Sequence, residues 1–91
     1  MNTPSEEIRA MMETFGLSEV ALAEHLGVNG RTVVELLQGR APITAEIALR
    51  LEAVFEITAK TWMNYQRDHE LATAEKSVGA LIKQTTKSVM K

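Results

Sequence analysis

The sequence predicts an all-α protein of five helices followed by a short C-terminal tail or an extra helix. Apolar residues recur at helical spacing along most of the 91 residues, and capping residues and glycines separate the periodic segments. Strand signals are weak, because aromatic residues make up 4% of the chain and no stretch alternates cleanly between apolar and polar residues. These observations favour one small helical domain.

The first helix is expected to begin after Thr3 and to end at Gly16. Thr3 is suited to be the N-cap, Pro4 to be the first helical residue, and Glu6 to complete a capping box. Behind this start, four apolar residues fall on one face of the helix and are expected to point inward: Ile8, Met11, Met12 and Phe15.

Two short helices should follow, over residues 18–26 and 30–38. Ser18 and Asn29 are typical N-cap residues, and Gly39 is suited to a left-handed conformation at the end of the third helix. A fourth helix is expected from Thr44 to Phe55, and a fifth from Thr58 to about Glu75. We expect residues 3–75 to form the domain and residues 76–91 to form a basic, partly ordered tail.

Residues 18–38 have the spacing of a helix-turn-helix. Ala23 is small enough to let two helices cross closely, and Gly27 supplies the turn four residues later. Val33 and Leu36 then pack the second helix against the first. This order predicts that the second helix is presented to the major groove of DNA. The alternative is a plain helical hairpin in a small bundle, and the polar outer face of the second helix argues against it.

The candidate DNA contacts are the residues left on that outer face and at the neighbouring helix ends. Arg31 is suited to a phosphate or a guanine edge, and Glu35 to a cytosine amino group, although an ordinary solvated glutamate is an equal reading of Glu35. Arg40 is placed for a phosphate or is an ordinary surface arginine. The predicted DNA-binding residues are Asn29, Gly30, Arg31, Thr32, Glu35, Arg40 and Thr44.

Charge and composition limit the class of protein. The net charge is −2 and there is no cysteine, so disulfides and thiolate metal sites are excluded. Residues 1–75 hold all twelve acids and six bases, whereas residues 76–91 hold four lysines and no acid. A general electrostatic nucleic-acid binder would be more basic, so any DNA binding must use a few well-placed cations. With neither an apolar membrane span nor a leader pattern, we expect a cytoplasmic protein without membrane contact.

No arrangement of residues predicts catalysis, a metal or a cofactor. His69-Glu70-Leu71-Ala72-Thr73 begins like the zinc-protease motif H-E-x-x-H but lacks the second histidine, and the other histidine, His25, lies far away in the sequence. There is neither a glycine-rich phosphate loop nor a nucleophile turn. We therefore expect a binding protein and not an enzyme.

Residues 27–44 resemble the lambda-repressor-like (XRE) helix-turn-helix family, in its HigA-type antitoxin branch. Thr3-Pro4-Ser5-Glu6 looks like the opening His-Pro-Gly-Glu of that branch, residues 43–51 look like its I-T-x-x-x-A-L-R-L helix, and residues 61–66 look like its F-W-x-N-L-Q segment. The resemblance covers about residues 3–75. This chain departs from the branch at Thr3, Ser5 and Tyr65, and at Glu56, where a helix-ending glycine is common.

The resemblance implies a dimeric protein that binds operator DNA, represses its own operon and neutralises a toxin, usually an mRNA endonuclease. The implied partners are double-stranded operator DNA, a second copy of the chain and a small basic toxin. It also implies a dimer contact in the last helix, at Trp62, Asn64, Tyr65 and Gln66. Two other functions stay open: a helix-turn-helix regulator without a toxin, and a helical protein-interaction module.

Overall fold

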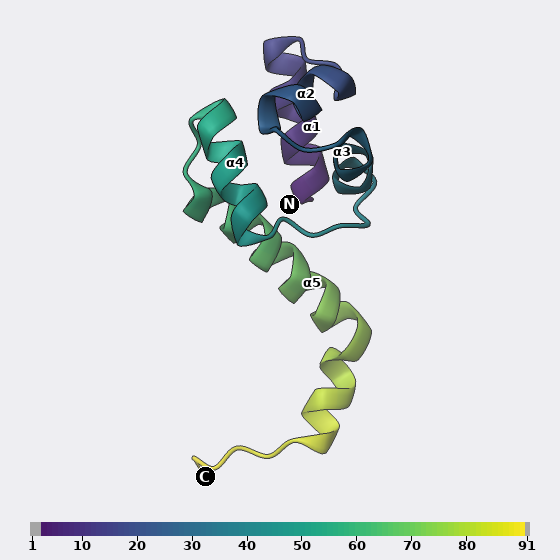
Figure 1. Cartoon of the computed structure of the whole chain (residues 1–91). Coiled ribbons are helices and arrows are strands. Elements are labelled where there is room, and N and C mark those ends of the chain that lie inside the picture. The colour runs from purple at the N-terminus through teal and green to yellow at the C-terminus, as the bar shows by residue number, and fades with distance from the viewer. Residues whose placement is uncertain (1–2, 91) are drawn as a thin grey trace.

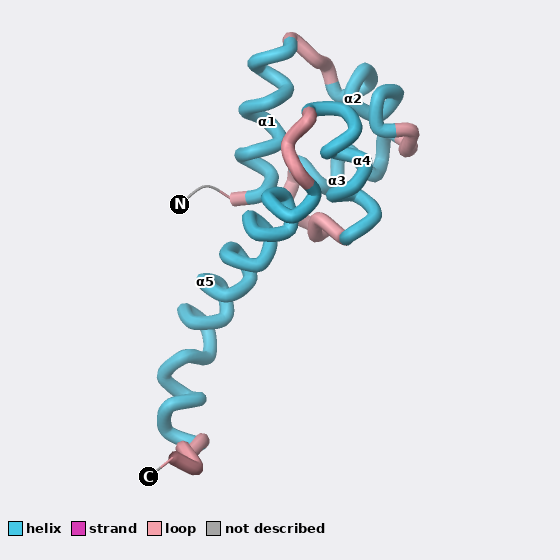
Figure 2. The backbone as a smooth tube through the Cα atoms, turned by 90° about the vertical axis from the view of Figure 1, so that its left-hand side faces the viewer, coloured by secondary structure: helices cyan, strands magenta, loops and turns pink. Residues whose placement is uncertain are grey.

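Five helices make up the fold. The computed structural model describes residues 3–90, in which α1 spans Pro4–Phe15, α2 Glu19–Leu26, α3 Gly30–Leu37, α4 Ala45–Phe55 and α5 Ala59–Thr85 (Figure 1). Helices α1 to α4 cluster around the start of α5, and the rest of α5 projects from this cluster as a rod (Figure 2). The predicted all-α, five-helix fold is confirmed.

Each helix begins at an N-cap residue that the sequence indicated. The side-chain oxygen of every cap accepts a hydrogen bond from the backbone N–H three residues later, which satisfies one otherwise unpaired donor of the first turn. At α1 the capping box is complete, because the Thr3 N–H also donates to Glu6 Oε1 at 2.7 Å. This bond, followed by the bond to the Thr3 side chain, holds the pKa of Glu6 below its usual value. The five N-caps are Thr3, Ser18, Asn29, Thr44 and Thr58.

One hydrophobic core joins all five helices. Trp62 on α5 is fully buried, and its ring lies 6.3 Å from Phe55 and 5.6 Å from Tyr65. Phe15 is an exception to the predicted inward face of α1, because 58% of it is exposed. It sits in the last turn of α1, where its ring covers Phe55 from outside at 5.8 Å instead of entering the core. The other large core residues are Ile8, Leu22, Leu26, Val33, Leu36, Leu37, Ile43 and Leu51.

Helix α5 is longer than the sequence predicted. It was expected to end near Glu75, but it continues for ten residues to Thr85. A single glycine, Gly79, costs a helix only about 1 kcal/mol relative to alanine, and good helix formers such as Ala80, Leu81 and Lys83 surround it. The basic tail is therefore helical for most of its length.

Glu56 ends α4 in a left-handed conformation, with φ 59° and ψ 29°. It is the only non-glycine residue with positive φ among residues 3–90. A residue with a side chain in this conformation destabilises the fold by about 1–2 kcal/mol. Glycine removes this strain, but it also raises the conformational entropy of the unfolded chain, which cancels part of the gain. We expect Glu56→Gly to raise the free energy of unfolding by about 0.5–1 kcal/mol in a urea titration. An unchanged or lower value would show that the Glu56 side chain compensates for the backbone.

Candidate nucleic-acid interface

The turn between α2 and α3 has the geometry that the sequence predicted. Gly27 has φ 73° and its N–H donates to Ala23 O at 2.9 Å, while the Val28 N–H donates to the same oxygen at 3.1 Å. Val28 is half-buried against the core, and Ala23 is buried at the crossing of the two helices. These bonds close α2 and direct the chain into α3, so the helix-turn-helix prediction for residues 18–38 is supported by its backbone.

Arg50 on α4 fixes this turn from outside the motif. Its Nη1 donates to Leu26 O at 2.8 Å and to Gly27 O at 3.4 Å, and its Nη2 lies 3.1 Å from Glu46 Oε2. The guanidinium thus supplies donors to carbonyls that the end of α2 leaves unpaired. Sequence reasoning missed this role. The only signal was an arginine four residues after a glutamate on one helix.

Asn29 and Thr32 bond to each other at the start of α3. Asn29 Oδ1 accepts from the Thr32 N–H at 2.8 Å and from the Thr32 hydroxyl at 2.9 Å. The hydroxyl hydrogen of Thr32 is therefore used within the protein, whereas the side-chain amide of Asn29 stays available as a donor. The two predicted contact residues form one unit instead of two independent donors.

Two arginines supply the positive charge of this surface. The Arg31 side chain is 86% exposed, and its Nε lies 3.7 Å from Glu35 Oε2, which is a loose pair of low energy. Arg40 is exposed just past the end of α3, where its backbone N–H donates to Glu35 O at 2.9 Å. Because the pair of Arg31 with Glu35 is loose and exposed, a phosphate or a base edge can replace Glu35 as the partner of Arg31 at little cost in free energy.

The outer face of α3 includes two residues that the sequence analysis overlooked. Val34 is 36% exposed and Gln38 is exposed, and both follow Gly30 at intervals of four residues. Positions i, i+4 and i+8 lie on one face of a helix, so this spacing was the available signal. The outer face of α3 therefore carries Gly30, the apolar Val34, the amide of Gln38 and the cation of Arg31.

Thr44 lies at the start of α4, where its hydroxyl accepts from the Ile47 N–H at 3.3 Å. Capping explains its presence, and its side chain is exposed. Its predicted contact with DNA stays a prediction.

The structure places two predicted dimer residues inside the protein. Trp62 is fully buried, and Gln66 is 8% exposed. Gln66 Oε1 accepts from the Ile43 N–H at 2.8 Å, and its Nε2 donates to Glu70 at 2.8 Å, so it pairs a backbone donor of the α3–α4 loop. Both residues have core roles and little surface to offer a second copy. A dimer contact by the half-exposed Asn64 and Tyr65 stays a prediction.

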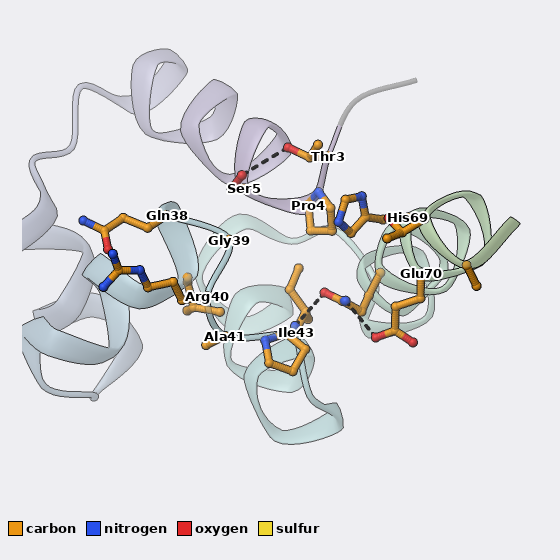
Figure 3. A pocket seen from close by; sticks show the side chains of 15 residues that line it. Thr3, Pro4, Ser5, Gln38, Gly39, Arg40, Ala41, Ile43, His69 and Glu70 are labelled. Carbon is orange, nitrogen blue, oxygen red and sulfur yellow. Dashed lines mark hydrogen bonds between the residues drawn. The ribbon is translucent and has the colours of Figure 1, made fainter. Parts of the chain in front are cut away.

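An open hollow of about 540 Å³ lies beside this loop (Figure 3). It is bounded by the start of α1, the α3–α4 loop and the middle of α5, where His69 and Glu70 line it. Within residues 3–90, no three histidine, aspartate or glutamate side chains converge as a metal site. No helix in that part of the chain is both long and apolar enough to cross a membrane.

A helix-turn-helix family model matches residues 8–62. The chain belongs to the helix-turn-helix family. Virulence-associated protein I of Dichelobacter nodosus is 37% identical over 73 residues, which cover 79% of this chain and 68% of that protein. The solved structure of Pseudomonas aeruginosa antitoxin HigA with the higBA promoter has a TM-score of 0.92 at 32% identity, covering 98% of each chain.

A second structure from Pseudomonas aeruginosa, PA4674 in complex with its 18-bp operator DNA, has a TM-score of 0.93 at 32% identity. It covers 99% of this helix-turn-helix chain and 96% of that one, so the similarity extends beyond the motif to the long fifth helix. The predicted resemblance to HigA-type antitoxins is confirmed by these similarities.

Proposed function

We propose that this helix-turn-helix protein is a cytoplasmic antitoxin that binds operator DNA as a homodimer and represses its own operon. The observation that carries the proposal is the surface made by the outer face of α3 and the residues just past its end. Arg31 on the helix and Arg40 beyond it are exposed there, and Arg50 holds the turn before the helix. Two solved relatives of nearly the same length are complexes with promoter or operator DNA, which supports the same ligand for this chain.

In this mechanism, α3 enters the major groove and its outer face meets base edges. The exposed start of α3 donates backbone N–H groups to a phosphate, and Arg40 neutralises a second phosphate. Arg31 leaves Glu35 for a phosphate or a guanine. Since the protomer has few cations on this surface, two protomers are needed to add their contacts on a palindromic site.

The toxin partner is proposed to dock on the outer faces of α1 and α2. Glu13, Glu19 and Glu24 are exposed there and have no ion-pair partner within residues 3–90. An enzyme that cleaves RNA needs a basic surface for its polyanionic substrate. Binding of the purified protein encoded by the adjacent gene, measured by calorimetry, tests this half of the proposal. If that protein does not bind, the toxin part of the proposal is rejected and the chain is a DNA-binding regulator without a toxin partner.

Removing both arginines of the α3 surface is the test of DNA binding. We expect Arg31→Ala with Arg40→Ala to weaken binding of the upstream DNA about 30-fold or more, because each protomer loses two phosphate or base contacts. The measurement is fluorescence anisotropy at two salt concentrations, with scrambled DNA as competitor. Lys60→Ala, which removes an exposed cation outside the helix-turn-helix, is the control. Wild-type affinity in the double variant would reject this face as the DNA surface.

Gly30 gives a test in which stability and binding change in opposite directions. It is helical, and a Cβ at this position would meet no atom within 4 Å, so nothing inside the protein requires a glycine. We expect Gly30→Ala to raise the free energy of unfolding by about 0.5–1 kcal/mol and to weaken operator binding, because the added methyl separates α3 from the groove. Thermal melts without DNA and anisotropy with DNA measure the two effects. A stabilised variant with unchanged affinity would show that DNA does not approach Gly30 closely.

A further inference from the structure

An arginine of another helix holds the end of α3. Arg9 on α1 extends its guanidinium to the last residue of α3, where Nη2 donates to Leu37 O at 3.1 Å in a partly buried bond. Glu13 lies four residues later on α1, which is the usual place for an ion-pair partner, yet no salt bridge joins it to Arg9. The guanidinium is therefore directed to α3 and not along its own helix.

The bond from Arg9 completes the pairing of the carbonyls at the end of α3. The last four carbonyls of an α-helix have no partner within the helix. Backbone N–H groups of residues 38–41 supply donors for three of them, the oxygens of Val34, Glu35 and Leu36. The donor for the fourth, Leu37 O, is the Arg9 side chain. Because α3 has no basic residue in its own last turn, Arg9 also brings the positive charge that the C-terminus of a helix favours.

Leu37 is thereby fixed from two sides, just before the loop that carries Arg40. Its side chain is 4% exposed in the core, and its carbonyl is held by Arg9. Gln38, Gly39 and Arg40 follow directly (Figure 3). Gly39 has φ 73°, and a glycine leaves the chain more conformational freedom than any other residue. The position of Arg40 therefore depends on how firmly the carbonyl before this glycine is held.

Arg9 has a counterpart in Arg50. Arg50 donates to Leu26 O at the end of α2, and Arg9 donates to Leu37 O at the end of α3. Both bonds are charge-assisted and both come from helices outside the helix-turn-helix, α4 in one case and α1 in the other. Together they hold α3 at the turn before it and at its last residue.

We propose that Arg9 is a positioning residue for operator binding, which acts through Arg40 by holding the end of α3 and the start of the loop after it. This inference rests on the DNA binding of the proposed function and adds a residue to it. Without the bond to Leu37 O, the last turn of α3 opens more often, and Arg40 spends less time where a phosphate can meet it. Ordering that turn again opposes binding.

A double-mutant cycle with Arg40 tests this route. Arg9→Met keeps a long side chain and a good helix former but removes the donor. We expect it to weaken binding of the labelled upstream DNA about fivefold in fluorescence anisotropy, and Arg9→Lys, which keeps a donor and the charge, to recover part of the affinity. In an Arg40→Ala background, Arg9→Met should have almost no further effect. Lys60→Met, which removes an exposed cation at the start of α5, is the control.

Two results of this cycle overturn the inference. Unchanged affinity in Arg9→Met would show that the end of α3 needs no support from α1. An equal loss with and without Arg40 would show that Arg9 does not act through Arg40. A direct contact of Arg9 with a phosphate would in addition lower the salt dependence by about one ion in both backgrounds.

Amide hydrogen exchange of the full chain without DNA separates this inference from the proposed function. We expect Arg9→Met to speed exchange of the Arg40 and Ala41 N–H groups, which bond to Glu35 O, and to leave the amides of α4 at wild-type rates. Unchanged exchange, or an equal increase throughout the protein, would reject the role of Arg9 alone. Failure of the wild type to bind its upstream DNA would instead reject the proposed function.

Discussion

Replacing Trp62 by alanine is expected to lower the free energy of unfolding by about 3–5 kcal/mol. The indole is fully buried between Phe55 and Tyr65, and the substitution leaves a cavity where α4 and α5 meet. Urea titration followed by circular dichroism measures the loss. The matched control is Met63→Ala on the same turn of α5, where 36% of the side chain is exposed and the expected loss is smaller.

The same variant separates a core role of Trp62 from a dimer contact. A core residue lowers stability by an amount that does not depend on protein concentration, whereas a residue between subunits has an effect that varies with concentration. We expect the difference between Trp62→Ala and the wild type to be constant over a hundredfold range of concentration. A difference that grows on dilution would return Trp62 to the interface.

The second large effect is expected at Gly27. Alanine at this position must adopt φ 73°, and its Cβ would lie 3.1 Å from Arg50 Nη1, the group that binds the carbonyls of the turn. We expect Gly27→Ala to cost about 2–3 kcal/mol. Because the turn sets the angle between α2 and α3, operator binding should weaken as well.

Gly39 provides the control for the backbone term at Gly27. It has the same φ of 73°, but a Cβ at Gly39 would meet no atom within 4 Å. Gly39→Ala should therefore cost only the left-handed strain of about 1–2 kcal/mol, less the unfolded-state entropy that alanine lacks, which leaves a net cost of about 0.5–1 kcal/mol. The excess at Gly27 should disappear in an Arg50→Ala background, as a double-mutant cycle would show. Equal costs at the two glycines would mean that Arg50 moves aside freely.

Most helix starts and turns were predictable because they depend on neighbouring residues. Asn29 bonds to Thr32, three residues away, and Gly39 adopts its left-handed conformation at the end of its own helix. The spacing of Ala23, Gly27 and Val33 was sufficient to predict the helix-turn-helix, since each residue acts on the turn beside it. Val34 and Gln38 were missed although their spacing from Gly30 was visible, because Val34 is apolar and was not considered an outward residue.

The errors fall where residues distant in sequence meet. The Gln66 side chain accepts a hydrogen bond from the Ile43 N–H, 23 residues away. The Arg50 side chain donates to the Leu26 carbonyl, 24 residues away. No local pattern indicates such partners. For Trp62 the sequence left core packing and a dimer contact open, and the packing of α4 on α5 buries its ring within the protomer.

Local sequence patterns were enough to predict the capped starts of the helices, the position of the helix-turn-helix and the charged and polar residues on the outer face of α3. These features arise from short-range hydrogen bonds and helical periodicity, which are encoded within a few residues. The packing of the helices determines that Arg50 supports the turn, that Phe15 lies outside and Trp62 inside, and that α5 projects from the other helices with Leu71, Leu81 and Ile82 exposed. Those outcomes depend on which surfaces are covered when five helices pack together, and burial is a property of the whole fold.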